Sequence, residues 1–157
     1  MRVNELMTTS VASVCAGQPL SEAARLMWEC DCGALPVVDD TTGRVVAMIT
    51  DRDICMASWS KNRSPGDISV AETMSRELYR CAPTDSVSSA EELMRSKQVR
   101  RVPVTDESGK LVGILSLADI VTESQQIRRG DGGELASAVI TSTLAKICRP
   151  HGVPSSI

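Results

Sequence analysis

The chain contains one segment twice, and this duplication restricts the possible folds more than any other feature. The stretch LSEAARLM returns as VSSAEELM, and GALPVVD returns as RRVPVTD. Met7 recurs as Met74, 67 positions later. One turn is a residue shorter in the second copy, so the offset beyond it is 66, and Asp53 corresponds to Asp119. Each copy is too short to bury a core alone. The repeat therefore predicts two copies of one supersecondary unit packed together.

Hydrophobic periodicity predicts the element order β-α-β-β-α in both copies. In the first copy we expect a helical lead-in over 3–7, a strand over 11–14, a helix opening at 18–21, strands over 34–38 and 44–49, and a helix over 50–59. The second copy should contain a strand over 79–81, a helix over 86–97, strands over 101–104 and 111–115, and a helix over 117–127. Ser21 is the expected N-cap of the first helix, and Gly33 should stop that helix.

The chain should divide into two repeats and a C-terminal extension. We expect the first repeat with its linker at 1–64, the second at 65–127, and a helix with a tail at 128–157. After the glycine-rich stretch 130–133 this helix should span 134–148, end at Arg149 and Pro150, and pack through Leu135, Val139, Leu144 and Ile147. The expected fold class is α/β (α+β): two tandem β-α-β-β-α repeats related by a pseudo-twofold axis, with the sheets face to face and the helices outside. A cleft along that axis is the expected ligand site.

Composition excludes several classes of function. Only 2% of the residues are aromatic and none is Phe, so the core must be aliphatic. A net charge of −3 and a pI near 5.2 lack the basic footprint of a nucleic-acid-binding protein. The sequence shows no apolar run of the ~20 residues that span a membrane and no apolar core of a signal peptide at its N-terminus. We expect a cytoplasmic protein without nucleic-acid or membrane partners.

Each copy ends its last strand with a hydroxyl residue that is followed three positions later by an aspartate. Thr50 precedes Asp53, and Ser116 precedes Asp119, both at a strand-to-helix junction. A helix N-terminus attracts phosphate, the hydroxyl adds a donor, and the carboxylate can accept both hydroxyls of a ribose. The same spacing also makes an ordinary helix cap, so the pattern by itself leaves a nucleotide site and a cap equally open.

Two further features could complete a nucleotide site. Pro36 and Pro103 each remove a donor from a strand, which should therefore lie at an edge or bulge and could offer free backbone groups to a base. Protection of a sheet edge is the alternative. A basic group could reach phosphates, although such clusters more often form solvated surface; its members are Arg95, Lys97, Arg100 and Arg101, with Arg52 in the other copy.

Six cysteines suggest a second type of site. They are Cys15, Cys30, Cys32, Cys55, Cys81 and Cys148, and the chain has one histidine, His151. The Cys30-x-Cys32 pair with Cys15 or Cys55 could form a disulfide or bind zinc, yet a full tetrahedral ligand set is not visible in the sequence. Burial as small apolar side chains is the common role of such residues in a reducing compartment. We therefore expect no metal site.

These motifs resemble those of a known family. GALPVVD and RRVPVTD resemble the middle strand of a CBS domain, and VVAMITDRDI and LVGILSLADI resemble its closing G-h-h-[ST]-x-x-D segment. The likeness covers about residues 3–125 twice and in register, so the chain is similar to a CBS-domain pair, or Bateman module. The QVRRVPV stretch and the late AKICRP segment make it most similar to stand-alone bacterial two-CBS proteins of the mycobacterial hypoxic-response type.

The resemblance implies a non-catalytic regulatory or signal-transduction module. Such modules form homodimers and bind an adenine nucleotide of the AMP, ADP, ATP, NAD or S-adenosylmethionine class in the cleft between the repeats; we expect AMP as the regulatory ligand and an effector protein as partner. By position, the ligand-binding residues are Thr50, Arg52, Asp53, Ala34, Leu35, Pro36, Ser116, Asp119, Lys97, Arg100, Arg101, Val102 and Pro103. Two departures, Ala47 where the second copy has Gly113 and Gly33 where it has Arg100, imply unequal sites.

The sequence offers no catalytic centre, because one histidine near the end of the chain cannot supply an acid–base group to two sites. We therefore expect a protein that is not an enzyme and requires no cofactor. The alternative function is a redox- or metal-responsive stress protein that uses its cysteines and binds no nucleotide.

Overall fold

The structure, a computed structural model, describes residues 1–128 and 134–147. The first repeat contains β1 (Val14–Cys15), α1 (Leu20–Glu29), β2 (Ala34–Val38), β3 (Val45–Thr50) and α2 (Asp51–Lys61). The second contains α3 (Val87–Lys97), β4 (Arg101–Thr105), β5 (Leu111–Ser116) and α4 (Leu117–Arg128). Short 3-10 helices, η1 (Val3–Glu5), η2 (Pro65–Asp67) and η3 (Val70–Glu72), lie outside these units, and α5 (Glu134–Ile147) follows them.

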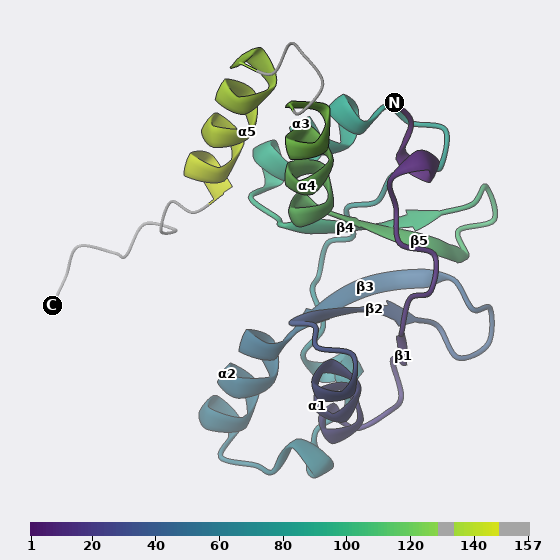
Figure 1. Ribbon diagram of the computed structural model, residues 1–157. Coiled ribbons are helices and arrows are strands. Elements are labelled where there is room, and N and C mark those ends of the chain that lie inside the picture. The colour runs from purple at the N-terminus through teal and green to yellow at the C-terminus, as the bar shows by residue number, and fades with distance from the viewer. Residues whose placement is uncertain (129–133, 148–157) are drawn as a thin grey trace, which may run out of the picture.

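The two sheets meet in the middle of the molecule, and the helices lie outside them (Figure 1). The first sheet has the order β1-β2-β3, and the second pairs β4 with β5, both hairpins being antiparallel. The hairpins touch at their turns, where Arg44 bridges Lys110 and the Val45 amide donates to the Gly109 carbonyl over 3.0 Å. This arrangement confirms the predicted fold class of two α/β repeats with facing sheets.

The first eight residues pack against the second repeat. Val3 is fully buried in the core of that repeat, and Thr8 exchanges two backbone hydrogen bonds of 2.9 Å with Ile114. The absence of a side chain at Gly113 permits this crossing, because a Cβ there would lie 2.5 Å from the sulfur of Met7. The N-terminal segment therefore belongs to one repeat by sequence and to the other by packing.

Residues 68–75 make the reverse crossing onto the first repeat. The Leu20 amide donates to the Ile68 carbonyl over 2.8 Å, and the Ser75 amide donates to the Met48 carbonyl over 2.9 Å. Ile68 is fully buried in the first core. Each repeat thus contributes a segment to the core of the other, and these two segments connect the repeats through packing and hydrogen bonds.

Glu72 links residues 68–75 to the end of α2 through ion pairs. Its Oε2 lies 2.9 Å from Lys61 Nζ and 3.3 Å from Arg63 Nη1, and its Oε1 accepts the Ser69 amide over 3.0 Å. The hydrogen bond from Lys61 is the main reason that the pKa of Glu72 falls to about 2.

The first helix opens within the predicted range 18–21, but the residues predicted to end it on each side are wrong. Pro19, not Ser21, is the N-cap, because the long-range bond between Leu20 and the crossing segment starts the helix two residues earlier. The left-handed residue that follows the helix is Asp31 (φ 48°), and not Gly33, which was predicted to stop the helix. The Cys32 amide then donates to the Met27 carbonyl over 2.9 Å, which completes the C-terminal end of the helix.

The strands predicted over 11–14 and 79–81 are also mostly wrong. β1 covers only Val14–Cys15, which pair in parallel with Val37 and Val38, and Cys81 alone bridges Val104. The preceding residue in each copy would face a proline of the neighbouring strand, and that proline has no N–H to donate. The prolines therefore limit the pairing. Pro103 lies in a two-stranded sheet, in which each strand is an edge, whereas β2 is the central strand of its sheet, so that Pro36 is not in an edge strand but lies beside a shift of register between Val37 and Val38.

The C-terminal helix forms over Glu134–Ile147 and lies beside α3 and α4 (Figure 1). Ile147 is buried as predicted, whereas Leu144 is exposed because that side of the helix faces away from the second repeat. The helix is held by Thr143, whose hydroxyl donates to Glu91 over 2.8 Å, and by Gln98, whose amide donates to the Lys146 carbonyl over 3.1 Å. The predictions for 130–133, the side chains of Leu135 and Val139, and 148–157 lie outside the described residues.

Candidate functional site

The first hydroxyl–aspartate pair forms a reciprocal hydrogen-bonded cap. Thr50 ends β3 and is the N-cap of α2, and its Oγ1 accepts the Asp53 amide over 3.2 Å. In return, Asp53 Oδ2 accepts the Thr50 amide over 2.9 Å and the Thr50 hydroxyl over 2.6 Å. Both side chains are half-buried. The local pattern therefore fixes the carboxylate rigidly against the first turn of the helix.

The second pair repeats this geometry. Ser116 Oγ accepts the Asp119 amide over 3.2 Å, and Asp119 Oδ2 accepts the Ser116 amide over 2.8 Å and the Ser116 hydroxyl over 2.7 Å. Among the described residues, no hydrogen bond reaches the Oδ1 atom of either aspartate. An ionised carboxylate has about four acceptor positions, so capping leaves one oxygen of each aspartate for an external hydroxyl. A cap and a ribose-binding group are thus compatible in the same residue.

The strand register brings the start of each proline strand beside its hydroxyl–aspartate pair. Ala34 lies opposite Thr50, and Arg101 lies opposite Ser116. Five of the predicted backbone positions, Ala34, Leu35, Pro36, Val102 and Pro103, are buried in β2 and β4. Since β1 pairs with β2 only from Val37 onward, the first residues of β2 have no strand partner on that side among the described residues.

The predicted cations lie in different surroundings. Arg52 and Arg100 are exposed, and Arg101 is half-buried at the start of β4. Arg101 lies close enough to Cys32, in the other repeat, for its charge to oppose the burial that raises the pKa of that thiol. Lys97 is directed elsewhere, with Nζ 5.1 Å from the centre of the Tyr79 ring. The structure therefore places Arg101 opposite Ser116 at the second junction and gives Lys97 another partner.

The two junctions carry different charges. In the first, Asp51 follows the hydroxyl residue, and a Cβ on Gly33 would lie 3.2 Å from Asp51 Oδ2. In the second, Leu117 takes the place of that acid, and its amide donates over 2.8 Å to the carbonyl of Arg100, the counterpart of Gly33. One junction is thus acidic and closely packed, and the other is basic.

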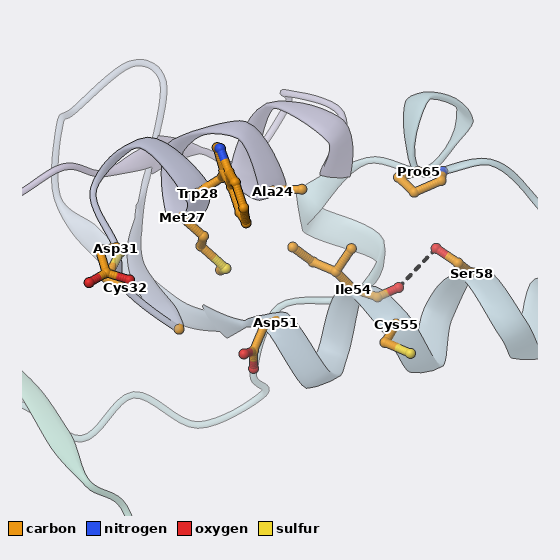
Figure 2. Close-up of a pocket in the computed structure, with 11 residues that line it drawn as sticks. Ala24, Met27, Trp28, Asp31, Cys32, Asp51, Ile54, Cys55, Ser58 and Pro65 are labelled. Atoms are coloured by element: carbon orange, nitrogen blue, oxygen red, sulfur yellow. Dashed lines mark hydrogen bonds between the residues drawn. The ribbon is translucent and has the colours of Figure 1, made fainter.

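Two hollows are described, and neither is lined by the residues predicted to bind a nucleotide, although the first includes the candidate cysteines Cys32 and Cys55. A hollow of about 560 Å³ lies between α1 and α2 (Figure 2). Its lining is Ala24, Met27, Trp28, Asp31, Cys32, Gly33, Asp51, Ile54, Cys55, Ser58 and Pro65. A second, of about 440 Å³, lies beside the turn of the second hairpin and includes Arg80, Asp85 and Asp106. The sequence analysis missed the first hollow, although Trp28, one of only two tryptophans in the chain, was a usable signal.

The five cysteines within the described residues are free thiols. Cys30 and Cys55 are exposed, whereas Cys81 is buried, and burial raises its pKa to about 11. In the described part of the chain, no three side chains of the His, Cys, Asp and Glu types come together to hold a metal ion. Cys148 and His151 lie outside that part. Across the same residues, the helices are too short or too polar to cross a membrane.

Comparison with known proteins identifies relatives of the whole repeat pair. The CBS domain family matches the chain twice, at residues 3–60 and 66–125. CBS domain-containing protein YhcV of Bacillus subtilis is 42% identical over 118 residues, which are 75% of this chain and 81% of that protein. Hypoxic response protein 1 of Mycobacterium tuberculosis is 35% identical over 151 residues, 96% of each chain.

Solved structures share the fold. The crystal structure of Hypoxic Response Protein I with two coordinated zinc ions is 34% identical, has a TM-score of 0.71 and covers 78% of this chain and 98% of that one. CBSX2 of Arabidopsis thaliana in complex with AMP is 26% identical, with a TM-score of 0.68 and coverage of 82% and 98%. The CBS domain pair of MJ0100, in complex with 5′-methylthioadenosine and S-adenosyl-L-methionine, is 25% identical, with a TM-score of 0.68 and coverage of 81% and 98%. With both repeats matched in sequence and in fold, this chain belongs to the CBS domain family and contains a pair of CBS domains.

Proposed function

We propose that this protein is a non-catalytic regulatory module that binds an adenine nucleotide between its two CBS domains, with AMP as the preferred ligand. The observation that carries the proposal is the duplicated strand-to-helix junction. At each junction a rigidly held aspartate, Asp53 or Asp119, keeps Oδ1 free beside a helix N-terminus and the start of a proline strand. The AMP complex of CBSX2 and the S-adenosyl-L-methionine complex of MJ0100 support this class of ligand.

The geometry suggests how the parts of a nucleotide would be bound. The free oxygen of the aspartate would accept the two ribose hydroxyls. The positive end of the α2 or α4 dipole, with the Thr50 or Ser116 hydroxyl, would face the phosphate. Backbone groups at the start of β2 and β4 would contact the adenine edge. Arg101, opposite Ser116 at the second junction, would neutralise the phosphate charge more directly than Lys97, whose ammonium group lies over the Tyr79 ring.

The proposed ligand is a signal rather than a substrate. The side chains at the junctions are carboxylates, hydroxyls and arginines, which bind a nucleotide without a nucleophile–base pair. The proposed output therefore passes through the shape of a homodimer or through an effector protein in the cytoplasm. We retain the division into repeats at 1–64 and 65–127 and an extension at 128–157 as the proposed domain limits.

A titration of AMP into the full-length protein tests this proposal directly. We expect heat of binding, and a rise in the unfolding temperature because a ligand of the native state stabilises that state. Asp53→Asn and Asp119→Asn should each remove or weaken one site, whereas Asp51→Asn, at an exposed neighbouring position, should leave affinity within a few-fold. If AMP, ADP, ATP, NAD and S-adenosylmethionine all fail to bind wild type, the proposal is overturned.

A second candidate function is a redox- or metal-responsive protein. Cys32 and Cys55 line the same hollow, and the similar structure of Hypoxic Response Protein I holds two zinc ions. Mass spectrometry after thiol alkylation under reducing and oxidising conditions, with a zinc assay, tests this function. Alkylation of all six thiols under both conditions and absence of zinc would exclude it.

A further inference from the structure

At the first strand-to-helix junction, the chain itself occupies the N–H groups that open the helix. The Asp51 amide donates to the Gly33 carbonyl over 3.1 Å. The Asp53 amide donates to Thr50 Oγ1 over 3.2 Å. Between them, the Arg52 amide donates to Asp51 Oδ1 over 2.7 Å. A carboxylate of α2 therefore takes the position in which an external anion would accept that hydrogen bond.

The second junction leaves one such group free. The Leu117 amide donates to the Arg100 carbonyl over 2.8 Å, and the Asp119 amide donates to Ser116 Oγ over 3.2 Å, as in the first repeat. The Ala118 amide between them has no hydrogen-bond partner in the part of the chain that the structure describes. Ala118 is also exposed. An available N–H at the positive end of a helix favours a negatively charged group.

Charged side chains follow the same division. The first repeat has Asp31, Asp51 and Arg52 at positions whose counterparts are uncharged, and the second has Arg100 and Arg101 at such positions. Apart from the ribose-binding aspartate that both share, the first junction has one net negative charge and the second has two positive charges. Within residues 1–128 and 134–147, the side chains of Arg100 and Arg101 make no ion pair. Both guanidinium groups are thus available to a phosphate.

We propose that Asp51 and the pair Arg100 and Arg101 set different ligand classes at the two junctions. The second junction binds an adenosine 5′-phosphate, and the first binds an adenosine whose 5′ group carries no negative charge, such as a hydroxyl, a thioether or a sulfonium. This inference rests on the proposed nucleotide-binding function and names the ligand of each site. Because Asp53 and Asp119 hold the ribose alike, discrimination occurs at the 5′ group, where a carboxylate repels a phosphate and fixed cations attract it.

Packing couples the two differences between the junctions. A Cβ on Gly33 would lie 3.2 Å from Asp51 Oδ2, so an arginine at position 33 requires removal of that carboxylate. In the second repeat, Arg100 and Leu117 occupy the matched positions together, and the Leu117 amide bonds the Arg100 carbonyl as Asp51 bonds Gly33. The backbone of the junction therefore accepts either pair, and both residues must be exchanged to convert one junction into the other.

Isothermal titration of the full-length protein with AMP and with 5′-methylthioadenosine tests the inference. The two ligands share adenosine, so the ratio of their affinities reports the 5′ group alone. Asp53→Asn leaves the second junction, where AMP should bind about 10–100-fold more tightly than 5′-methylthioadenosine, the contribution of hydrogen bonds to a charged group. Asp119→Asn leaves the first junction, where AMP should bind no more tightly than 5′-methylthioadenosine.

Exchange of the matched residues is a gain-of-function test. In the Asp119→Asn background, Gly33→Arg combined with Asp51→Leu should raise AMP affinity about 10-fold and leave 5′-methylthioadenosine affinity unchanged. Asp51→Asn alone removes one exposed charge and should change AMP affinity by only about 3-fold. Glu107→Lys is the control, because it changes the net charge as much as the exchange does but lies in the turn between β4 and β5, at the other end of that hairpin. It should leave both affinities unchanged.

A separate variant leaves the glycine in place. In the Asp53→Asn background, Arg101→Gln should lower AMP affinity about 10-fold and retain 5′-methylthioadenosine affinity; thermal denaturation checks that each variant is folded. Equal affinity ratios in Asp53→Asn and Asp119→Asn, or a folded exchange variant with unchanged AMP affinity, would overturn this inference and leave the proposed function intact. Failure of wild type to bind any adenosine ligand would overturn both.

Discussion

Replacing Asp53 by alanine should destabilise the protein in the absence of any nucleotide. The substitution removes Oδ2, which accepts the Thr50 amide over 2.9 Å and the Thr50 hydroxyl over 2.6 Å. Loss of a helix-capping interaction costs ~0.5–2 kcal/mol, and an amide left without its acceptor adds to this cost. Because the site is half-buried, water replaces part of the lost bonding, and we expect a total loss of about 2 kcal/mol.

Thermal and urea denaturation of the ligand-free protein measure this loss. For a chain of this size, about 2 kcal/mol corresponds to a fall of ~4–8 °C in the unfolding temperature, with an unchanged urea m-value. Asp53→Asn keeps an acceptor and should lose less. Asp51→Ala, at an exposed residue that bonds only its neighbour's amide, should remain within about 0.5 kcal/mol of wild type.

Wild-type stability of Asp53→Ala would refute the reciprocal cap, and with it the fixed orientation on which ribose binding depends. The same experiment is a control for the nucleotide assay, because it separates loss of the helix cap from loss of a contact with the ligand. A variant that has lost its cap can lose binding through local unfolding of the first turn of α2. The asparagine variant is therefore the better test of the ligand, and the alanine variant is the better test of the fold.

Three further outcomes follow from the packing and the charges. Gly113→Ala should destabilise the fold by about 1–2 kcal/mol, because its Cβ would lie 2.5 Å from the sulfur of Met7. In a double-mutant cycle, Met7→Ala should restore part of this loss of stability. Wild-type stability of Gly113→Ala would contradict the close crossing of the N-terminal segment over Gly113. The pKa of Glu72 is lowered from 4.5 to about 2, so its ion pairs contribute stability that is present above pH 4.5 and is lost as the pH falls toward 2. The urea midpoint measured against pH should show this loss, and Glu72→Gln should abolish it. An unchanged pH dependence in that variant would assign the loss to other carboxyl groups. Exposed Cys55 should be alkylated before buried Cys81, whose pKa is raised to about 11, and equal rates in time-resolved mass spectrometry would show that the second core opens readily.

The order of elements could be predicted because it depends on local periodicity, which both copies display. The hydroxyl–aspartate boxes could also be predicted, since residues three positions apart at a strand-to-helix junction must lie within hydrogen-bonding distance. Duplication strengthened both predictions. The first copy supplied the expected limits of the second, and the only shift between them is the single residue missing from the second turn.

Long-range contacts explain the errors. Leu20 bonds to the distant crossing segment, so α1 begins after Pro19 and not at Ser21. Parallel pairing with β2 stops at Pro36, so the strand predicted over 11–14 is reduced to two residues. Neither effect can be predicted from the affected residues alone, because each depends on a partner that is brought close only by folding.

Local sequence patterns were enough to predict two α/β repeats, an aliphatic core, and a hydroxyl–aspartate pair after each last strand. Those properties arise from side chains that are neighbours along one helix or one strand. Three features follow instead from long-range packing. Residues 1–8 and 68–75 exchange repeats, Arg101 lies opposite Ser116 while Lys97 lies over the Tyr79 ring, and α5 covers one helical face and leaves the other open among the described residues. These choices depend on contacts between distant segments, whose free energy is gained only when the whole chain is folded.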